Sequence, residues 1–250
     1  MVKFVLITVS IVSHGQGELV SQLLGDLRDH CASIPFHVLL TQNIEEQCAF
    51  DKGEYPFQIN VIRNKHARGF AANHNDAFKI AEGDFFCVLN PDIRFQSDPF
   101  PLLVAGLLAD PEIGVIAPLV TGIQGQIEDS ARFFPTPYSI MRKAIFGRGI
   151  PDYAVEHKPI KPDWVGGMFM LWHEHAFRQI GGFDDSFFLY YEDVDACARL
   201  RRSGFSIHLI PEVRVIHIAQ RSSHRRILYF VWHLKSMLLF FWKKFFLKLY

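Results

Sequence analysis

The sequence contains few cysteines and no excess of either charge. The four cysteines form no CxxC pair or ligand cluster, and Cys87 lies inside an apolar run, so we expect a reducing compartment rather than disulfides. The 26 basic and 26 acidic residues give a formal net charge of zero and a pI near 7.2. No global field therefore favours nucleic acid, and we expect no nucleic-acid partner.

Features of targeting, repetition and long apolar runs are also missing. The sequence begins directly with a strand-like segment, Val2 to Val12, without the basic stretch and cleavage site of a signal peptide. It shows no internal repeat and no low-complexity linker. A length of 250 residues suits one main domain with a well-buried core. We therefore expect a cytoplasmic protein.

Apolar runs alternate with helical stripes through the first 120 residues. We expect strands at 3–12, 36–40, 57–62, 85–89 and 115–118. We expect helices at 17–31, near 99–109, and from an opening segment at 68–75 to about 81. This order predicts an α/β fold with a mostly parallel, three-layer sheet. The second half predicts a short helix at 138–146, a strand at 163–172 interrupted by two glycines, a helix at 193–203, and strands at 205–210 and 213–218.

The expected central strand, Phe85–Leu89, is followed directly by Asn90-Pro91-Asp92. Because Pro91 cannot donate to a strand ladder, pairing should stop there and leave Asp92 in a loop at the carboxyl end of the strand. In open α/β sheets this edge is where ligands bind. A carboxylate held there can ligate a hard divalent cation, which in turn can hold a diphosphate. The alternative is a turn that only ends the strand.

Polar loops follow the other expected strands as well, and they should meet at the same edge of the sheet. We expect a nucleotide to lie across them, with Arg68 and the amides that open the next helix facing its diphosphate. Ordinary turn chemistry explains each loop singly but not the set. The loop residues considered are Ser13, His14, Thr41, Gln42, Asn43, Arg68, Gly69, Asn90 and Asp92.

An acidic, aromatic-rich segment precedes the helix expected at 193–203. Glu192 and Asp193 fall at the start of this helix, where carboxylates complement the helix dipole. A carboxylate at that position is also held ionised toward a cleft and can accept a proton from a hydroxyl. His217, after the last core strand, is either a satisfied structural group or a ligand.

The C-terminal segment is basic and aromatic. No acidic residue follows Glu212, and residues 218–250 contain seven lysines and arginines. Its uncharged apolar stretches are far shorter than the roughly 18 residues of a spanning helix, so we expect a helix in the plane of lipid headgroups. We divide the chain into a domain at 1–226 and a membrane-surface helix at 227–250. Alternatively the helix packs on the domain through Trp232 and Leu234, with only residues 236–250 on lipid.

Several of these motifs, in this order, resemble family 2 inverting glycosyltransferases of the GT-A fold. The similar segments are Gly69–Asn75, Leu89–Asp92, Trp164–Gly167, Gly182–Asp184, Tyr190–Asp195 and Val215–His217. Within the family the chain is most similar to bacterial rhamnosyltransferases of O-antigen and cell-wall linker assembly, through the segments Ile11–Gly15, Asp163-Trp164 and Trp232–Ser236.

The resemblance implies a nucleotide-diphospho-sugar donor, Mg²⁺ or Mn²⁺, and a lipid-linked saccharide acceptor. It makes Asp92 the metal-binding acid of the DxD position, with His217 near metal and diphosphate. It makes Asp193 the general base, beside Glu192, and it places Gly166 and Gly167 along the sugar pocket. Asn73, within the Gly69–Asn75 motif, joins the expected donor site.

Two positions depart from the family pattern. Asn90 replaces one acid of the DxD position, so a single carboxylate is left for metal. Thr41-Gln42-Asn43 replaces the usual Asp-Asn pair near the base, which leaves uracil and thymine both open. We favour transfer of L-rhamnose from dTDP-rhamnose to a sugar on a polyprenyl diphosphate, at the inner face of the plasma membrane. The alternatives are a sugar nucleotidyltransferase of the same fold and a non-catalytic scaffold of polysaccharide assembly.

Overall fold

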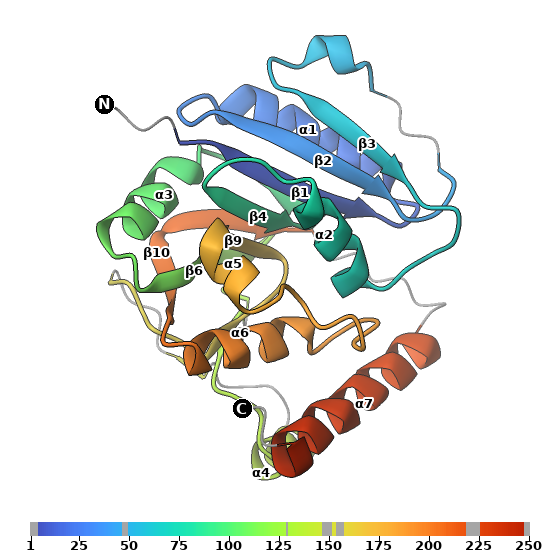
Figure 1. The fold of residues 1–250 in the computed structure, drawn as a ribbon, viewed down its shortest axis with the longest axis vertical. Helices are drawn as coiled ribbons and strands as arrows, with labels where there is room; N and C mark the ends of the chain where they lie inside the picture. Colours follow the sequence, from blue (N-terminus) through green and yellow to red (C-terminus); the bar gives the residue numbers. More distant parts are fainter. Residues whose placement is uncertain are drawn as a thin grey trace.

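The chain folds around one mixed sheet of eight strands in the order β3-β2-β1-β4-β9-β6-β10-β5 (Figure 1). The computed structural model describes residues 5–46, 50–128, 130–146, 152–153, 158–218 and 226–247. The strands are β1 (Ile7–Ser13), β2 (Phe36–Gln42), β3 (Ile59–Arg63), β4 (Phe85–Leu89), β5 (Ile93–Arg94), β6 (Ile113–Gly122), β9 (Phe169–His173) and β10 (Ser206–His217). A separate pair joins β7 (Ala131–Arg132) to β8 (Trp164–Val165).

Helices cover both faces of this sheet, as the alternating sequence pattern predicts. They are α1 (Gly17–His30), α2 (Phe70–Lys79), α3 (Phe100–Ala109), α4 (Pro137–Phe146), α5 (Glu174–Gln179), α6 (Glu192–Arg202) and α7 (Arg226–Trp242), with the short helical segments η1 (Lys52–Glu54) and η3 (Lys243–Leu247). One apolar cluster joins α1 and α3 to the sheet, and a second joins α2, α5 and α6 to its other face. The predicted three-layer α/β architecture is therefore confirmed.

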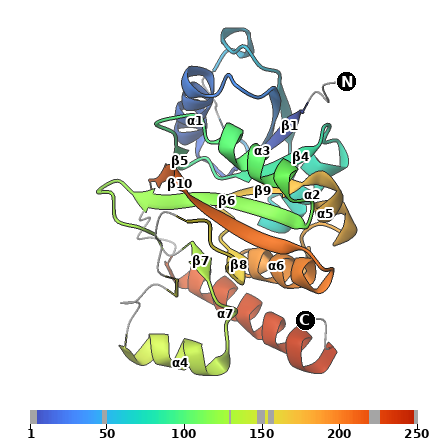
Figure 2. The same ribbon diagram turned by 90° about the vertical axis from the view of Figure 1, so that its left-hand side faces the viewer.

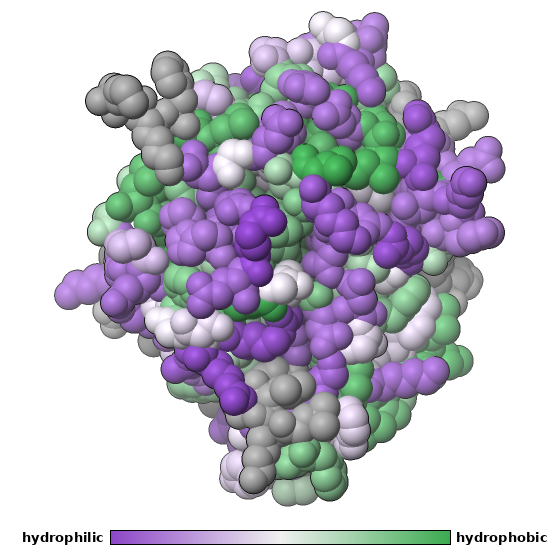
Figure 3. Space-filling model, in the orientation of Figure 1, coloured by the Kyte–Doolittle hydropathy of each residue, from purple (hydrophilic) through white to green (hydrophobic). Residues whose placement is uncertain are grey.

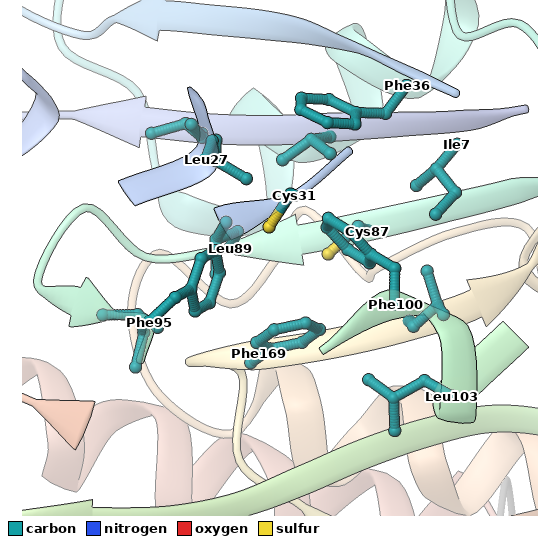
Figure 4. Packing of buried hydrophobic residues seen from close by; sticks show 14 of the residues in the cluster. Ile7, Leu27, Cys31, Phe36, Cys87, Leu89, Phe95, Phe100, Leu103 and Phe169 are labelled. Carbon is teal, nitrogen blue, oxygen red and sulfur yellow. The ribbon is translucent and has the colours of Figure 1, made fainter. Parts of the chain in front are cut away.

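The first cluster holds the centre of the sheet in place. Cys87 on β4 and Phe169 on β9 lie between the two α-helices and the neighbouring strands, with Phe100 of α3 against them (Figure 4). Phe100 and Phe169 pack ring to ring at 6.2 Å. Burying side chains of this size is worth roughly 1.5–3 kcal/mol each. The strands whose ends carry polar loops are thus fixed by the apolar residues within them.

Two strands differ from their expected bounds. β6 extends to Gly122 through Pro118, although proline cannot donate to a ladder. β6 pairs with β9 only at Val115 and Ile116, and β10 bulges between Ile210 and Arg214. The N–H group that Pro118 lacks is therefore missing where the hydrogen bonding of β6 to its neighbours is already interrupted. β10 itself is one bulged strand, where we expected two. The short helix α5 was not expected, since six residues carry little periodic signal.

The C-terminal helix packs on the domain over much of its length, which corrects the expectation that residues 236–250 contribute little to the fold. Ser236 donates to the carbonyl of Leu189 at 2.8 Å, and the buried Phe240 lies 5.5 Å from the ring of Tyr191. Lys243, expected to reach lipid, is buried and forms an ion pair with the partly buried Asp184. Figure 2 shows α7 and α4 below α6, at the end of the molecule away from α1.

The opposite face of α7 carries exposed apolar side chains, and Leu234, expected to pack inward, is among them. In Figure 3 apolar groups lie among polar ones along the lower right edge, where Figure 1 places α7. Among the described residues, no helix has the length and apolar character needed to cross a bilayer. The helix thus has one face on the domain and one toward solvent.

Candidate active site

The loops at the carboxyl ends of β1, β2 and β4 surround a cavity of about 500 Å³, which we call the donor cavity after the ligand that the sequence resemblance predicts there. The parallel register of β1 with β2 and β4 brings these ends to one edge of the sheet, as expected. β4 stops at Leu89, directly before the Asn-Pro-Asp turn. The sequence-predicted residues that line the cavity are His14, Asn43, Arg68, Asn73, Asn90 and Asp92.

A network of side-chain amides forms one wall of the donor cavity. Asn64 donates to Asn43 at 2.9 Å and to Asn73 at 2.6 Å. Asn43 accepts the backbone N–H of Arg68 at 2.8 Å and donates to its carbonyl at 2.8 Å. These bonds fix the loop that opens α2. The guanidinium of Arg68 forms an ion pair with Asp76 and is about two-fifths exposed.

Asp92 lines this cavity and contacts His217, which does not line it among the described residues. β5 pairs with the end of β10, and His217 Nε2 lies 3.2 Å from Asp92 Oδ2. His217 Nδ1 lies 2.7 Å from Glu128 Oε2. Burial lowers the pKa of His217, but the two carboxylates outweigh it and raise this pKa to about 9. His217 is therefore held as a cation between Asp92 and Glu128, a partner that the sequence did not indicate.

The residues around Asp92 fit a divalent cation in part. Asp92 Oδ1 is buried and has no hydrogen-bond partner within the described part of the chain. Such an oxygen is a suitable ligand for Mg²⁺ or Mn²⁺. The described residues contain no cluster of three or more His, Cys, Asp or Glu side chains arranged for metal binding. A cation here would thus need most of its ligands from water and substrate phosphate.

Asp193 lies in the first turn of α6 and lines a second cavity of about 490 Å³, which we call the acceptor-side cavity after the general-base role that the sequence resemblance predicts for Asp193. Its Oδ2 accepts the N–H of Gly167 at 3.0 Å and its Oδ1 the N–H of Val194 at 2.8 Å. Burial raises the pKa of Asp193, while these two donors and Arg132 lower it. The carboxylate is thus oriented by the backbone and faces a cavity large enough for a sugar.

Glu192, unlike Asp193, does not face either cavity. Its side chain is buried, and Oε2 has no hydrogen-bond partner among the described residues. Burial, together with Asp193 and Asp195, raises the pKa of Glu192 well above its usual range. A buried neutral acid beside Asp193 can shape the site, but it does not line either cavity.

The loop before α6 is held in an unusual backbone conformation. Tyr190 and Tyr191 both have positive φ, near 70°, which costs energy for residues with a side chain. The ring of Tyr190 packs on His233 of α7 at 5.4 Å, and that of Tyr191 does the same. Such strained positions cluster at functional sites, and here both tyrosines line the acceptor-side cavity.

The remaining expected residues support these cavities without lining them. Ser13 is buried and donates to Glu46 at 2.8 Å. A Cβ on Gly69 would meet the carbonyl oxygen of Phe188 at 2.7 Å, so this close approach requires glycine. Gly166 donates to the carbonyl of Ser130, and Gly167 holds Asp193.

Sequence reasoning missed the contribution of α7 to both cavities. Tyr229 and Trp232 line the donor cavity, whereas the next residue, His233, lines the acceptor-side cavity. The Trp232 ring packs on Phe188 at 4.9 Å. The segment 232–236 carried part of the family resemblance, and that was the available signal.

Comparison with known proteins agrees with this geometry. The family model described as "Glycosyl transferase family 2" matches residues 41–166, and one described as "N-terminal domain of galactosyltransferase" matches residues 155–225. Rhamnosyltransferase WbbL of Escherichia coli K12 is 26% identical over 245 residues, covering 92% of this chain and 90% of WbbL. N-acetylglucosaminyl-diphospho-decaprenol L-rhamnosyltransferase of Mycobacterium tuberculosis is 29% identical over 151 residues, covering 57% of this chain and 49% of that protein.

Solved structures show the same fold at low identity. GalNAc-T7 with UDP, GalNAc and Mn²⁺ superposes with a TM-score of 0.68 at 15% identity, covering 88% of this chain and 44% of that one. The mannosyltransferase PcManGT of Pyrobaculum calidifontis, with GDP-Man and Mn²⁺, gives 0.60 at 15% identity, covering 88% and 59%. This chain therefore has the GT-A fold. The family match, the relatives and the fold together show that the chain belongs to glycosyltransferase family 2 and is a glycosyltransferase.

Proposed function

We propose that the protein is an inverting glycosyltransferase that moves L-rhamnose from dTDP-L-rhamnose to a sugar carried on a polyprenyl diphosphate, in the synthesis of a bacterial surface polysaccharide such as O-antigen. One observation carries the proposal. Asp92 lines one cavity and Asp193 another, with the loop at 188–191 between them. Separate donor and acceptor chambers, each with its own carboxylate, suit direct displacement. The names of the two relatives support rhamnose and a lipid-diphosphate acceptor.

The donor nucleotide would occupy the cavity lined by Asn43, Asn73 and Asp92. The amide wall offers hydrogen bonds for a nucleobase, and the N-terminus of α2 provides favourable partial charge for a diphosphate. His217 contacts Asp92 and, as a cation, offsets part of the negative charge that Asp92 would bring near that diphosphate. The proposed donor-binding residues are Ser13, His14, Asn43, Arg68, Gly69, Asn73, Asn90, Asp92, Gly166 and Gly167; Ser13 and the glycines act by shaping the backbone.

Transfer would proceed by displacement at the anomeric carbon. Asp193 accepts the proton of an acceptor hydroxyl, the new bond from that oxygen to the anomeric carbon forms, and the bond to the diphosphate oxygen breaks. The configuration inverts, and dTDP leaves. Asp92 would hold Mg²⁺ or Mn²⁺ through its unpartnered Oδ1, and the cation when bound would stabilise negative charge on the departing diphosphate. His217, the other predicted metal residue, would ligate the cation only after it loses a proton, because both of its ring nitrogens contact carboxylates here. The Gly167 N–H keeps the Asp193 carboxylate aimed into the acceptor-side cavity.

The acceptor would reach this site at the inner face of the plasma membrane. α7 exposes a row of large apolar side chains, with Lys235 and Lys244 on the same helix and its continuation. Apolar rings at headgroup depth with lysines near lipid phosphates are the pattern of an interfacial helix. The division into a catalytic domain at 1–226 and a membrane-surface helix at 227–250 belongs to this proposal. Because part of α7 packs on the domain, the contact would involve only its outer face.

A transfer assay with purified protein tests the proposal. dTDP-L-rhamnose, UDP-sugars and GDP-sugars are each incubated with a short-chain prenyl-diphospho-N-acetylglucosamine and Mn²⁺. We expect a rhamnosylated product with dTDP-L-rhamnose, of inverted anomeric configuration by NMR. Product only from a UDP- or GDP-sugar would contradict the assigned donor, and retained configuration would contradict the role of Asp193.

A further inference from the structure

The acceptor-side cavity contains two arginines in addition to Asp193. We infer that Arg132 and Arg142 form a binding site for the diphosphate of a lipid-linked acceptor, between the sugar at Asp193 and a lipid chain that leaves over α4. This inference rests on the proposed function, because it assigns the residues that would recognise that acceptor. Both arginines line the cavity, Arg132 from β7 and Arg142 from α4.

Arg132 lines the same cavity as Asp193 and is partly buried. Its guanidinium carbon lies 5.5 Å from the centre of the Trp164 ring, which limits its orientation. Its charge lowers the pKa of Asp193, so the two groups are electrostatically coupled. In the proposed acceptor the diphosphate is attached to the same sugar whose hydroxyl Asp193 would deprotonate. A cation close to that carboxylate is where such a diphosphate would lie.

Arg142, on α4, supplies the second positive charge of the cavity lining. It is exposed, and it belongs to α4, whose residues Ser139 and Ile140 also line the cavity. The cavity contains one further acid, Asp152, whose carboxylate accepts the Phe133 N–H at 3.2 Å. His233 of α7 is the remaining titratable group along the wall besides the two tyrosines. Guanidinium groups suit phosphate because their planar donors make paired hydrogen bonds.

The helix that carries Arg142 also exposes apolar side chains. α4 exposes Tyr138, Met141 and Ile145, each more than half accessible to solvent. Met141 and Ile145 are four residues apart and so share a face of this helix. α4 and α7 both line the cavity and lie together at one end of the molecule (Figure 2). A prenyl chain leaving a diphosphate at Arg142 would therefore meet the exposed apolar side chains of α4, at the same end of the molecule as α7.

Direct binding tests this assignment without requiring turnover. Farnesyl diphosphate and farnesol are titrated calorimetrically into the wild-type protein, Arg142→Gln, Arg132→Gln and Arg132→Lys in metal-free buffer. Loss of one charge-assisted contact to phosphate weakens binding roughly 10- to 100-fold. We expect this loss for farnesyl diphosphate in both Gln variants, partial rescue in Arg132→Lys, and no change for farnesol.

Two control variants locate the binding site. Arg28→Gln makes the same substitution at an exposed residue of α1, outside both cavities, and Asp92→Asn alters the donor cavity. Both should bind farnesyl diphosphate as the wild type does. If the wild type shows no affinity for farnesyl diphosphate, or if the arginine variants bind it unchanged, the assignment is wrong.

Kinetics separate this inference from the proposed function. In the transfer assay, Arg142→Gln should raise the KM for the prenyl-diphospho-sugar about tenfold, as one charge-assisted contact implies, with the donor KM unchanged. An acceptor with an uncharged linker in place of the diphosphate should show equal KM in wild type and variant. If the wild type transfers to neither acceptor, the proposed function fails, whereas the calorimetric result still decides the diphosphate site. If Arg142→Gln raises the KM equally for the diphosphate acceptor and for the uncharged acceptor, the assignment of the diphosphate site is wrong.

Discussion

Asp193 combines burial with a fixed orientation, which is what a general base requires. The N–H groups of Gly167 and Val194 hold the carboxylate in place. Burial raises its pKa toward neutral pH, which favours proton transfer from a hydroxyl. Asp193→Asn keeps the shape and removes the base. We expect kcat to fall roughly 10²- to 10⁴-fold with unchanged donor affinity, measured by steady-state kinetics and calorimetry. If Asp193→Asn turns over near the wild-type rate, another group acts as the general base. The acidic limb of the wild-type kcat/KM profile should lie above the usual range of an aspartate.

Asp92 has a different predicted phenotype, because its partners lie in the donor cavity. Asp92→Asn keeps one oxygen but removes the charge that would attract a cation and that pairs with His217. We expect Mn²⁺-dependent binding of dTDP to be lost and transfer to be nearly abolished. Calorimetric titration of dTDP with and without Mn²⁺ measures this. An unchanged Mn²⁺-dependent affinity would remove Asp92 from the metal site, and Asp193→Asn is the matched control.

His74 makes the fold sensitive to acid. It is fully buried beneath Phe70, lies 2.8 Å from the Ser10 hydroxyl through Nδ1, and burial lowers its pKa to about 3. The unfolded chain takes up this proton near pH 6.5, so the unfolded state binds more protons and stability falls as pH drops from about 6.5 toward 3. The slope attributable to His74 approaches about 1.4 kcal/mol per pH unit.

His74→Asn removes this titration while keeping a hydrogen-bonding atom near Nδ1. Denaturant unfolding between pH 7 and 4 should show a variant that is less stable at neutral pH but has a flatter pH dependence than the wild type. The exposed His30→Asn serves as the matched control and should follow the wild-type curve. If His74→Asn and the wild type lose stability in parallel, His74 is not the acid-sensitive group.

At the scale of elements, α7 is the segment that links the chemistry to the rest of the molecule. Lys243 pairs with Asp184 and donates to Ser186 at 2.8 Å, which fastens the end of the helical tail to the loop that leads to Asp193. Lys243→Met leaves the partly buried Asp184 carboxylate without its cation, at a cost of roughly 1–3 kcal/mol. We expect faster hydrogen exchange in 184–191 and lower kcat.

Lys244→Met is the matched control for this element. It makes the same substitution at the next residue, whose ammonium lies over the Phe240 ring at 5.9 Å rather than against Asp184. It should leave hydrogen exchange in 184–191 near the wild-type rate. Equal exchange in both variants would mean that the ion pair does not hold the loop.

The sequence predicted elements well where the signal was local. The run Phe85–Leu89 before Pro91 defined β4 correctly, because both the apolar run and the proline act within a few residues. The contacts of α7 were not predictable in the same way. Lys243 and Asp184 are 59 residues apart, and a lysine in a basic, aromatic tail looks the same whether it faces lipid or a buried carboxylate.

The candidate site shows the same division. Residues that follow strands, such as Asn43 and Asp92, were found because parallel strands bring their ends to one edge. Glu128 was missed, since it contacts His217 from an irregular segment 89 residues away in sequence. Arg132 and Tyr190 line a cavity built from β7, α4, α6 and α7, whose arrangement depends on tertiary packing rather than on any periodic pattern.

For the whole molecule, the distribution of exposed apolar residues distinguishes two ends. The end formed by α4 and α7 exposes large side chains over both helices, including Met141, Phe230 and Leu238. α3 also exposes Leu102 and Leu108, but on the sheet face covered by α1, away from α4 and α7 (Figures 1 and 2). An interfacial contact needs an apolar surface with basic residues near it. Residues of α4 and α7 line the acceptor-side cavity, whereas the described lining includes none from α3.

A paired substitution on that end tests the membrane contact without disturbing the buried face of α7. Phe230→Ser with Leu238→Ser removes two exposed apolar groups and leaves Ser236, Phe240 and Lys243 in place. Burial of apolar area at about 25 cal/mol per Å² drives interfacial binding, so sedimentation with anionic liposomes should fall by tenfold or more.

Leu102→Ser with Leu108→Ser on α3 is the matched control and should bind as the wild type does. Added salt should weaken wild-type binding by screening the lysines without abolishing it, because the apolar contribution is not screened. Transfer to a short, water-soluble acceptor should be unaffected in both pairs. If the α7 variant sediments with liposomes as well as the α3 control, the outer face of α7 is not the membrane contact.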